Sequence, residues 1–146
     1  MMDIHVNRAH EHSSLRGPIL WGLVVGALQA ASPFAFFGLE QATVHALYIS
    51  LIASVYIGFA VADGRPKVFA VEGTIAAVFV LIAIAGITGP VWLLVMGYAG
   101  HGLKDWWQER NHFVANTRWW PPFCAAVDLL VAAVLVVEVA AGVNFH

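Results

Sequence analysis

Five long apolar runs alternate with short polar segments along the chain, and each run has about the length that a membrane-spanning helix needs. Turn-forming residues separate the runs, because Asp63-Gly64-Arg65-Pro66 and Thr88-Gly89-Pro90 are strong turn signals. The pair Pro121-Pro122 suits the first turn of a further helix. The pattern predicts five helices, over about 17–37, 41–62, 68–86, 90–107 and 121–142.

The composition indicates that these helices lie in lipid. The 146 residues are 60% hydrophobic and only 11% charged, whereas a soluble domain carries about 25% charged residues. We therefore expect an all-α fold, a polytopic membrane helical bundle with one transmembrane domain over residues 17–146. The lipid bilayer is then its first partner, and the cell membrane, in a bacterium the inner membrane, its location. A formal net charge of −2 without a basic cluster argues against nucleic acid as a partner.

The segment before the first apolar run is polar. Its composition predicts a disordered tail over residues 1–16. Two alternatives stay open for this end of the chain. The histidines of the tail, His5, His10 and His12, could bind a transition metal, and the first apolar run could be the core of a cleaved signal peptide. Because the run is longer than a typical signal core, we expect a retained first span.

The positive charges predict the orientation of the bundle. If the N-terminus is cytoplasmic, the inner segments are the tail, the turn at 63–67 and the loop at 104–119. These segments contain all seven Lys and Arg residues, namely Arg8, Arg16, Arg65, Lys67, Lys104, Arg110 and Arg118. Cytoplasmic segments of membrane proteins carry the excess of Lys and Arg. We therefore predict five spans with the N-terminus in the cytoplasm and the C-terminus outside.

One apolar run is interrupted by ionisable residues at helical spacing. His101 and Asp105 lie four residues apart, which places an imidazole and a carboxylate on one helix face. The predicted topology puts both in the inner half of the membrane with Glu72 and Asp128, and Cys124 could join this layer. Ionisable side chains inside a membrane usually face the bundle interior and pair with one another. We expect Glu72, His101, Asp105 and Asp128 to form one site for a proton, a metal ion or a small polar ligand.

These residues also have structural interpretations. His101 and Asp105 could be a satisfied pair close to the membrane interface. Glu72 could pair with Lys67 or Lys104, whose long side chains reach along a helix end. Asp128 is the hardest to explain in this way, because the predicted topology places its carboxylate too deep in the membrane to reach water directly.

Polar and small residues elsewhere predict helix contacts. His45 and Glu138 lie in the outer half, and we expect them to form a structural polar pair between the second and fifth helices. The motif Gly22-x-x-x-Gly26 predicts close packing of the first helix. Three more glycines leave room for a neighbouring helix beside the ionisable residues: Gly97, Gly100 and Gly102.

The run Gly97-Tyr98-x-x-His101-Gly102-x-x-Asp105, with Glu72 upstream and Asp128 downstream, resembles a family of small bacterial and fungal multi-pass integral membrane proteins. The resemblance covers residues 40–130 approximately. It implies the membrane architecture and the grouping of the four ionisable residues, and it implies no particular activity.

Three classes of function agree with these patterns. The first, which we favour, is a binding or transport protein whose inner polar layer takes up the ligand. The second is a membrane-embedded, metal-dependent enzyme that acts on a lipid-like substrate, with the same four residues as ligands. The third is an accessory subunit of a larger membrane complex. Carboxylates and an imidazole suit zinc, manganese or iron, so a divalent metal is the candidate cofactor. Transport through so small a bundle would require a homo-oligomer.

Overall fold

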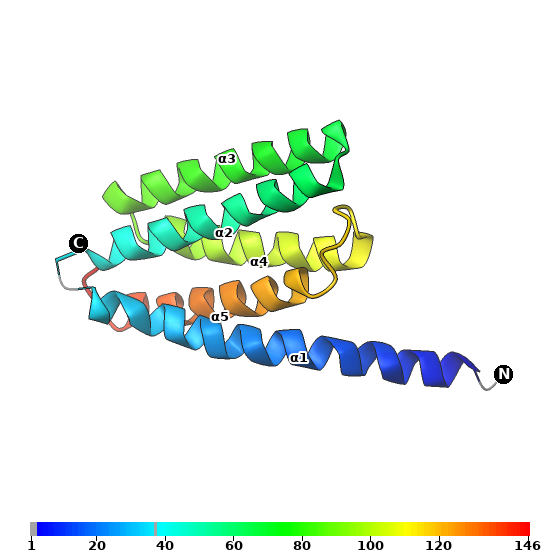
Figure 1. The fold of residues 1–146 in the computed structure, drawn as a ribbon. Helices are drawn as coiled ribbons and strands as arrows, with labels where there is room; N and C mark the ends of the chain where they lie inside the picture. The colour runs from blue at the N-terminus through cyan, green and yellow to red at the C-terminus, as the bar shows by residue number, and fades with distance from the viewer. Residues whose placement is uncertain (1–2, 37) are drawn as a thin grey trace.

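Helices are the only regular secondary structure among the residues that the computed structural model describes, 3–36 and 38–146, with side chains from Leu15 onward. The elements, drawn in Figure 1, are α1 (Asp3–Ala31), the short 3-10 helix η1 (Ser32–Ala35), α2 (Gln41–Asp63), α3 (Pro66–Thr88), α4 (Trp92–Asn111) and α5 (Trp120–Ala140). The five α-helices correspond to the five predicted runs. The prediction of an all-α fold is thus confirmed for the described residues.

Glycine and proline set the boundary between α2 and α3 close to the predicted position. Gly64 follows α2 in the left-handed conformation with φ 77°, and its N–H donates to the carbonyl of Ala60. A glycine at this position ends a helix without the steric penalty that a side chain would bring. Arg65 is extended, and Pro66 begins α3, where a missing backbone N–H costs nothing.

α1 begins earlier than the sequence predicts. Its backbone is helical from Asp3, whereas residues 1–16 are predicted as a disordered tail. No glycine or proline lies between Asp3 and Arg16, so nothing within this segment prevents a helix, and α1 continues through Gly17 and Pro18 although Pro18 has no backbone N–H to donate. In Figure 1 this part of α1 projects beyond the other helices.

α4 also continues further than predicted. The helix ends at Asn111 rather than at residue 107, because residues 108–110 are Gln, Glu and Arg, which favour a helix. His112 then takes the left-handed conformation with φ 48° and ends it. The polar loop between α4 and α5 is shorter as a result.

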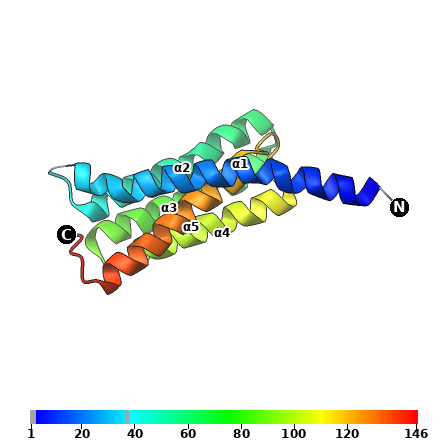
Figure 2. The same cartoon turned by 90° about the horizontal axis from the view of Figure 1, so that it is seen from below.

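α4 occupies the middle of the bundle. It packs against α5 on one side and against α2 and α3 on the other, while α1 packs on α5. Successive helices run in opposite directions, so the N-terminus and the C-terminus lie at opposite ends (Figure 1). Figure 2 shows the same bundle from below, with α1 running along its outside.

Four helices are long and apolar enough to cross a membrane, which supports a membrane protein. They are Leu15–Ala35, Gln41–Asp63, Pro66–Thr88 and Trp120–Ala140. α4 carries Lys104, Asp105, Glu109 and Arg110 and does not meet the same standard. Large apolar side chains point outward from the bundle, as the 68% exposure of Leu28 and the 67% exposure of Val137 illustrate.

Small residues allow the helices to approach one another closely. The buried positions of α2 and α3 are rich in alanine, including Ala46, Ala53 and Ala83. On α1, a Cβ added to Gly22 would lie only 2.7 Å from Ala126 Cβ of α5. The close packing predicted from the glycine motif of α1 is therefore confirmed, and its partner is α5.

Candidate functional site

α4 presents one buried polar face to the rest of the bundle. Tyr98, His101, Asp105 and Gln108 follow one another at intervals of three, four and three residues and are all buried. This spacing places the four side chains on one side of a helix. Because α4 lies between α5 and the α2–α3 pair, its polar face is turned toward the centre of the protein.

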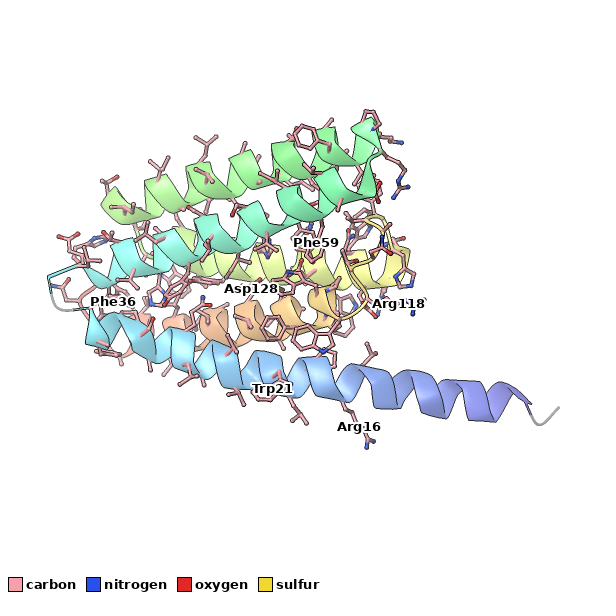
Figure 3. The ribbon with its side chains drawn as sticks, in the orientation of Figure 1. Arg16, Trp21, Phe36, Phe59, Arg118 and Asp128 are labelled. Carbon is pink, nitrogen blue, oxygen red and sulfur yellow. The ribbon has the colours of Figure 1, made fainter. Side chains whose placement is uncertain are left out.

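His101 is the centre of a compact group of ionisable side chains. Its Nδ1 atom lies 2.8 Å from Oδ2 of Asp128 on α5 and 3.3 Å from Oδ2 of Asp105, one turn along α4. All three residues are at most 2% exposed. Figure 3 shows Asp128 inside the bundle, away from both ends. The structure thus brings together three of the four residues expected to form the site.

Gly102 allows α4 and α5 to come close enough for this contact. A Cβ at this position would lie 2.9 Å from Leu129 Cγ and 3.3 Å from Asp128 Cβ. Gly97 has a similar role toward α2, since its Cβ would lie 3.0 Å from Ile49 Cδ1. A Cβ at Gly100 would meet Phe79 at the ordinary distance of 3.7 Å, so two of the three predicted glycines make close approaches.

Glu72 joins the cluster through a lysine. Oε2 of Glu72 lies 2.8 Å from Lys104 Nζ, which is also 4.0 Å from Oδ1 of Asp105. The same ammonium group lies 3.1 Å from the centre of the Tyr56 ring, a cation–π contact. Of the two lysines that were possible partners of Glu72, Lys104 is therefore the one that forms an ion pair with it.

Aromatic rings enclose the imidazole. Phe79 of α3 meets the His101 ring edge to face at a centroid distance of 4.9 Å, and the Tyr56 ring of α2 lies 5.9 Å away. Cys124 is buried one turn before Asp128. In the described part of the chain, the group whose ligand atoms could hold one metal ion contains His101, Asp105 and Asp128 but neither Cys124 nor Glu72.

The charges of the cluster do not balance. With a neutral imidazole it holds three carboxylates and one ammonium group, which gives a formal charge of −2. A net charge this deep in a protein is costly unless a counter-charge accompanies it. One divalent cation or two protons would neutralise the cluster.

Several polar atoms of the cluster also lack hydrogen bonds. Asp128 Oδ1, Asp105 Oδ1 and both polar atoms of the Gln108 amide are buried and have no hydrogen-bond partner among the described residues. Most buried polar groups in proteins have such a partner, so each exception asks for an explanation such as an ion or a water molecule. The oxygens among these atoms give the cluster unused capacity to bind a cation.

The predicted pair of His45 and Glu138 does not form. His45 is 1% exposed, and neither ring nitrogen has a hydrogen-bond partner among the described residues. The reason is the order of the helices, since α2 packs on α3 and α4 while α5 packs on α4 and α1. His45 instead lies edge to face with Tyr98, whose hydroxyl donates to the His45 carbonyl and accepts from Gln29.

Comparison of the chain with family models, with curated proteins and with solved structures finds no match to any of them. The family resemblance of the sequence therefore stays a prediction. The function has to be inferred from the geometry of the cluster.

Proposed function

We propose that this chain is a multi-pass membrane protein of the binding or transport type whose cluster of His101, Asp105 and Asp128 binds a divalent metal cation. The observation that carries the proposal is the arrangement of one possible ligand atom from each residue, all within 4.8 Å of one another and all buried. Lys104 neutralises Glu72 beside the cluster, so the three ligands would supply the two negative charges that match one divalent ion.

The ligand atoms are close to the spacing of ligands that share one ion, with one distance in the expected range and one, the His101–Asp128 hydrogen bond, slightly shorter. Ligand atoms about 2.1 Å from a metal are about 3.0–3.4 Å apart along an octahedral or tetrahedral edge. The distances from His101 Nδ1 to the two aspartate oxygens are 2.8 and 3.3 Å. A mixed set of nitrogen and oxygen ligands suits zinc, manganese or iron.

The polar face of α4 favours transport over static binding. Buried polar residues continue from the cluster in both directions, to Gln108 toward the α4–α5 loop and to Tyr98 toward the other end. Tyr98 is in turn connected with Gln29 and His45. Polar groups along one buried helix face are typical of ion pathways through membranes.

We further propose that all five helices cross the membrane, with the N-terminus in the cytoplasm and the C-terminus outside. α4 lies beside helices that are apolar enough to cross a membrane, and it runs in the direction opposite to α3 and α5 (Figure 1). The α2–α3 and α4–α5 connections lie at the end of the bundle from which the N-terminal part of α1 projects, and they contain Arg65 and Arg118. Figure 3 shows Arg16 and Arg118 toward this end. Positive charge gathers on the cytoplasmic side of membrane proteins.

Reporter fusions test this topology. A reporter fused after His146 should be extracytoplasmic, whereas one inserted near Asn111 should be cytoplasmic, because α5 separates the two positions. Activity of alkaline phosphatase and fluorescence of a green fluorescent protein distinguish the two sides. If the reporter near Asn111 is extracytoplasmic and the one after His146 is cytoplasmic, α4 does not cross and the five-span topology is wrong.

Elemental analysis of the purified protein tests the metal site. We expect about one divalent ion for each chain, removed by a chelator and restored by dialysis against zinc or manganese. The variants Asp128→Asn and His101→Ala should lower the affinity for the ion by at least about 100-fold, since removing even an outer partner of a metal ligand costs about 10–100-fold. Inductively coupled plasma mass spectrometry and calorimetry measure both quantities.

The variant Glu138→Gln is the matched control for Asp128→Asn. It makes the same change from carboxylate to amide on the same helix, and Glu138 lies outside the cluster. Its metal content should equal that of the unchanged protein. A metal-free protein that also fails to bind added metal would contradict the metal site and leave protons as the balancing charges.

A further inference from the structure

A cavity of about 730 Å³ opens at the end of the bundle that holds the α4–α5 loop. Its lining consists of Phe59 from α2, Trp120 at the start of α5, and residues 112 and 114–119 of the loop between α4 and α5. Sites for small ligands typically have volumes of about 300–1,000 Å³. This cavity is separate from the His101 cluster, whose residues do not line it.

Two residues of the α2–α3 turn hold the loop in place. Arg65 donates to the carbonyl of Phe113 at 2.7 Å, and Asp63 accepts from the N–H of Ala115 at 2.7 Å. Arg65 and Asp63 are themselves joined by an ion pair of 2.6 Å. The loop that lines the cavity is therefore held by hydrogen bonds to the connection between α2 and α3. Because the loop is already ordered, little conformational entropy would be lost when a ligand binds.

The lining of the cavity is suited to an anion. It contains Arg118 and His112 and no carboxylate. Arg118 has no hydrogen bond or ion pair with any residue of the described chain. The indole Nε1 of Trp120, a donor, is buried and lacks a hydrogen-bond partner in the same part of the chain. A guanidinium and an unused N–H are the groups that recognise a phosphate.

Aromatic side chains place the cavity at the level of the membrane interface. Trp119 lines it, stacks on Phe123 at a centroid distance of 4.7 Å and is still 45% exposed. Trp120 packs against Phe59 at 5.8 Å. Tryptophan is enriched at the level of lipid headgroups, where an apolar ring meets polar surroundings.

We propose that this cavity binds the headgroup of an anionic phospholipid, with the phosphate at Arg118 and Trp120 Nε1. The ligand is a lipid rather than a soluble anion because Phe59, Trp119 and Trp120 line the cavity beside α2 and α5, two helices that are long and apolar enough to lie among acyl chains. The cavity lies at the end of the bundle where the lysines and arginines gather, and anionic lipids are concentrated on the leaflet that such residues face.

Native mass spectrometry of the full chain in detergent tests the proposal, with phosphatidylglycerol and phosphatidylcholine as the probes. We expect one phosphatidylglycerol to bind each chain at least about tenfold more tightly than phosphatidylcholine. The variant Arg118→Gln should weaken phosphatidylglycerol binding about tenfold, and Trp120→Phe, which keeps a ring but removes the N–H, should also weaken it. Thermal unfolding of each variant checks that it is folded.

The variant Arg110→Gln is the matched control. Arg110 belongs to the same end of the bundle, but it lies over the Trp106 ring and does not line the cavity. Its affinity for phosphatidylglycerol should stay within about twofold of the unchanged protein. An equal loss in both arginine variants would mean unspecific attraction, and equal binding of phosphatidylcholine or of inorganic phosphate would overturn the lipid proposal.

Discussion

Replacing Lys104 with methionine should lower the free energy of unfolding by about 3–5 kcal/mol, because it leaves the buried Glu72 carboxylate without its partner. Glu72 is 1% exposed, so water cannot take the place of the ammonium group. Chemical unfolding of the detergent-solubilised protein, followed by circular dichroism, measures the difference.

Two further variants separate the ion pair from other effects of the change. Lys67→Met makes the same substitution at an exposed lysine of α3, the other partner that the sequence offers Glu72, and should cost less than about 0.5 kcal/mol. The double variant Lys104→Met with Glu72→Gln should recover much of the stability, since it removes both charges together. Costs that simply add in the double variant would mean that Glu72 and Lys104 do not interact.

Replacing Gly102 with valine should destabilise the protein by about 3 kcal/mol and abolish metal binding, because the new side chain would force α4 away from α5. Its Cβ alone would lie 2.9 Å from Leu129 Cγ and 3.3 Å from Asp128 Cβ. Separation of the two helices would also move Asp128 away from His101. In the unchanged protein, Asp128 Oδ2 lies 2.8 Å from His101 Nδ1. Metal stoichiometry and unfolding of the same preparation measure both effects.

Gly73→Val provides the control for this substitution. Gly73 also lies inside a helix, but no atom comes within 4 Å of a Cβ added there. The variant therefore brings the same change in helix propensity without a steric conflict, and it should keep its metal. If Gly73→Val lost as much stability as Gly102→Val, the effect would come from the propensity of valine and not from the approach of α4 to α5.

The helices could be predicted from the sequence because their signals are local. Gly64 and Pro66 mark the boundary of α2 and α3 within two residues, and the apolar runs mark the interiors. The errors lie where local signals are weak. Nothing in the polar segment after Asp3 forbids a helix, and residues 108–110 favour one. The five-span count and the orientation remain predictions.

The site could be predicted only as far as depth in the membrane determines which residues meet. Residues of one layer, such as His101 and Asp128, come together because α4 and α5 are neighbours. The predicted topology places His45 and Glu138 in one layer as well, but α2 packs on α3 and α4 while α5 packs on α4 and α1. A sequence does not state this order of helices around a bundle. Gln108 was missed for another reason, since it was placed in a loop beyond the predicted end of the helix.

The central position of α4 affects how the chain would be inserted into the membrane during synthesis. In the five-span topology that we propose, α4 is the span with the most charged residues, while the other four spans are long and apolar enough to cross a membrane. A charged residue at the centre of a lone helix costs about 3 kcal/mol on insertion. His101 and Lys104 of α4 meet Asp128 and Glu72 only when α5 and α3 are beside it. During synthesis α4 should therefore leave the translocon together with its neighbours, and truncation before α5 should leave it outside the membrane.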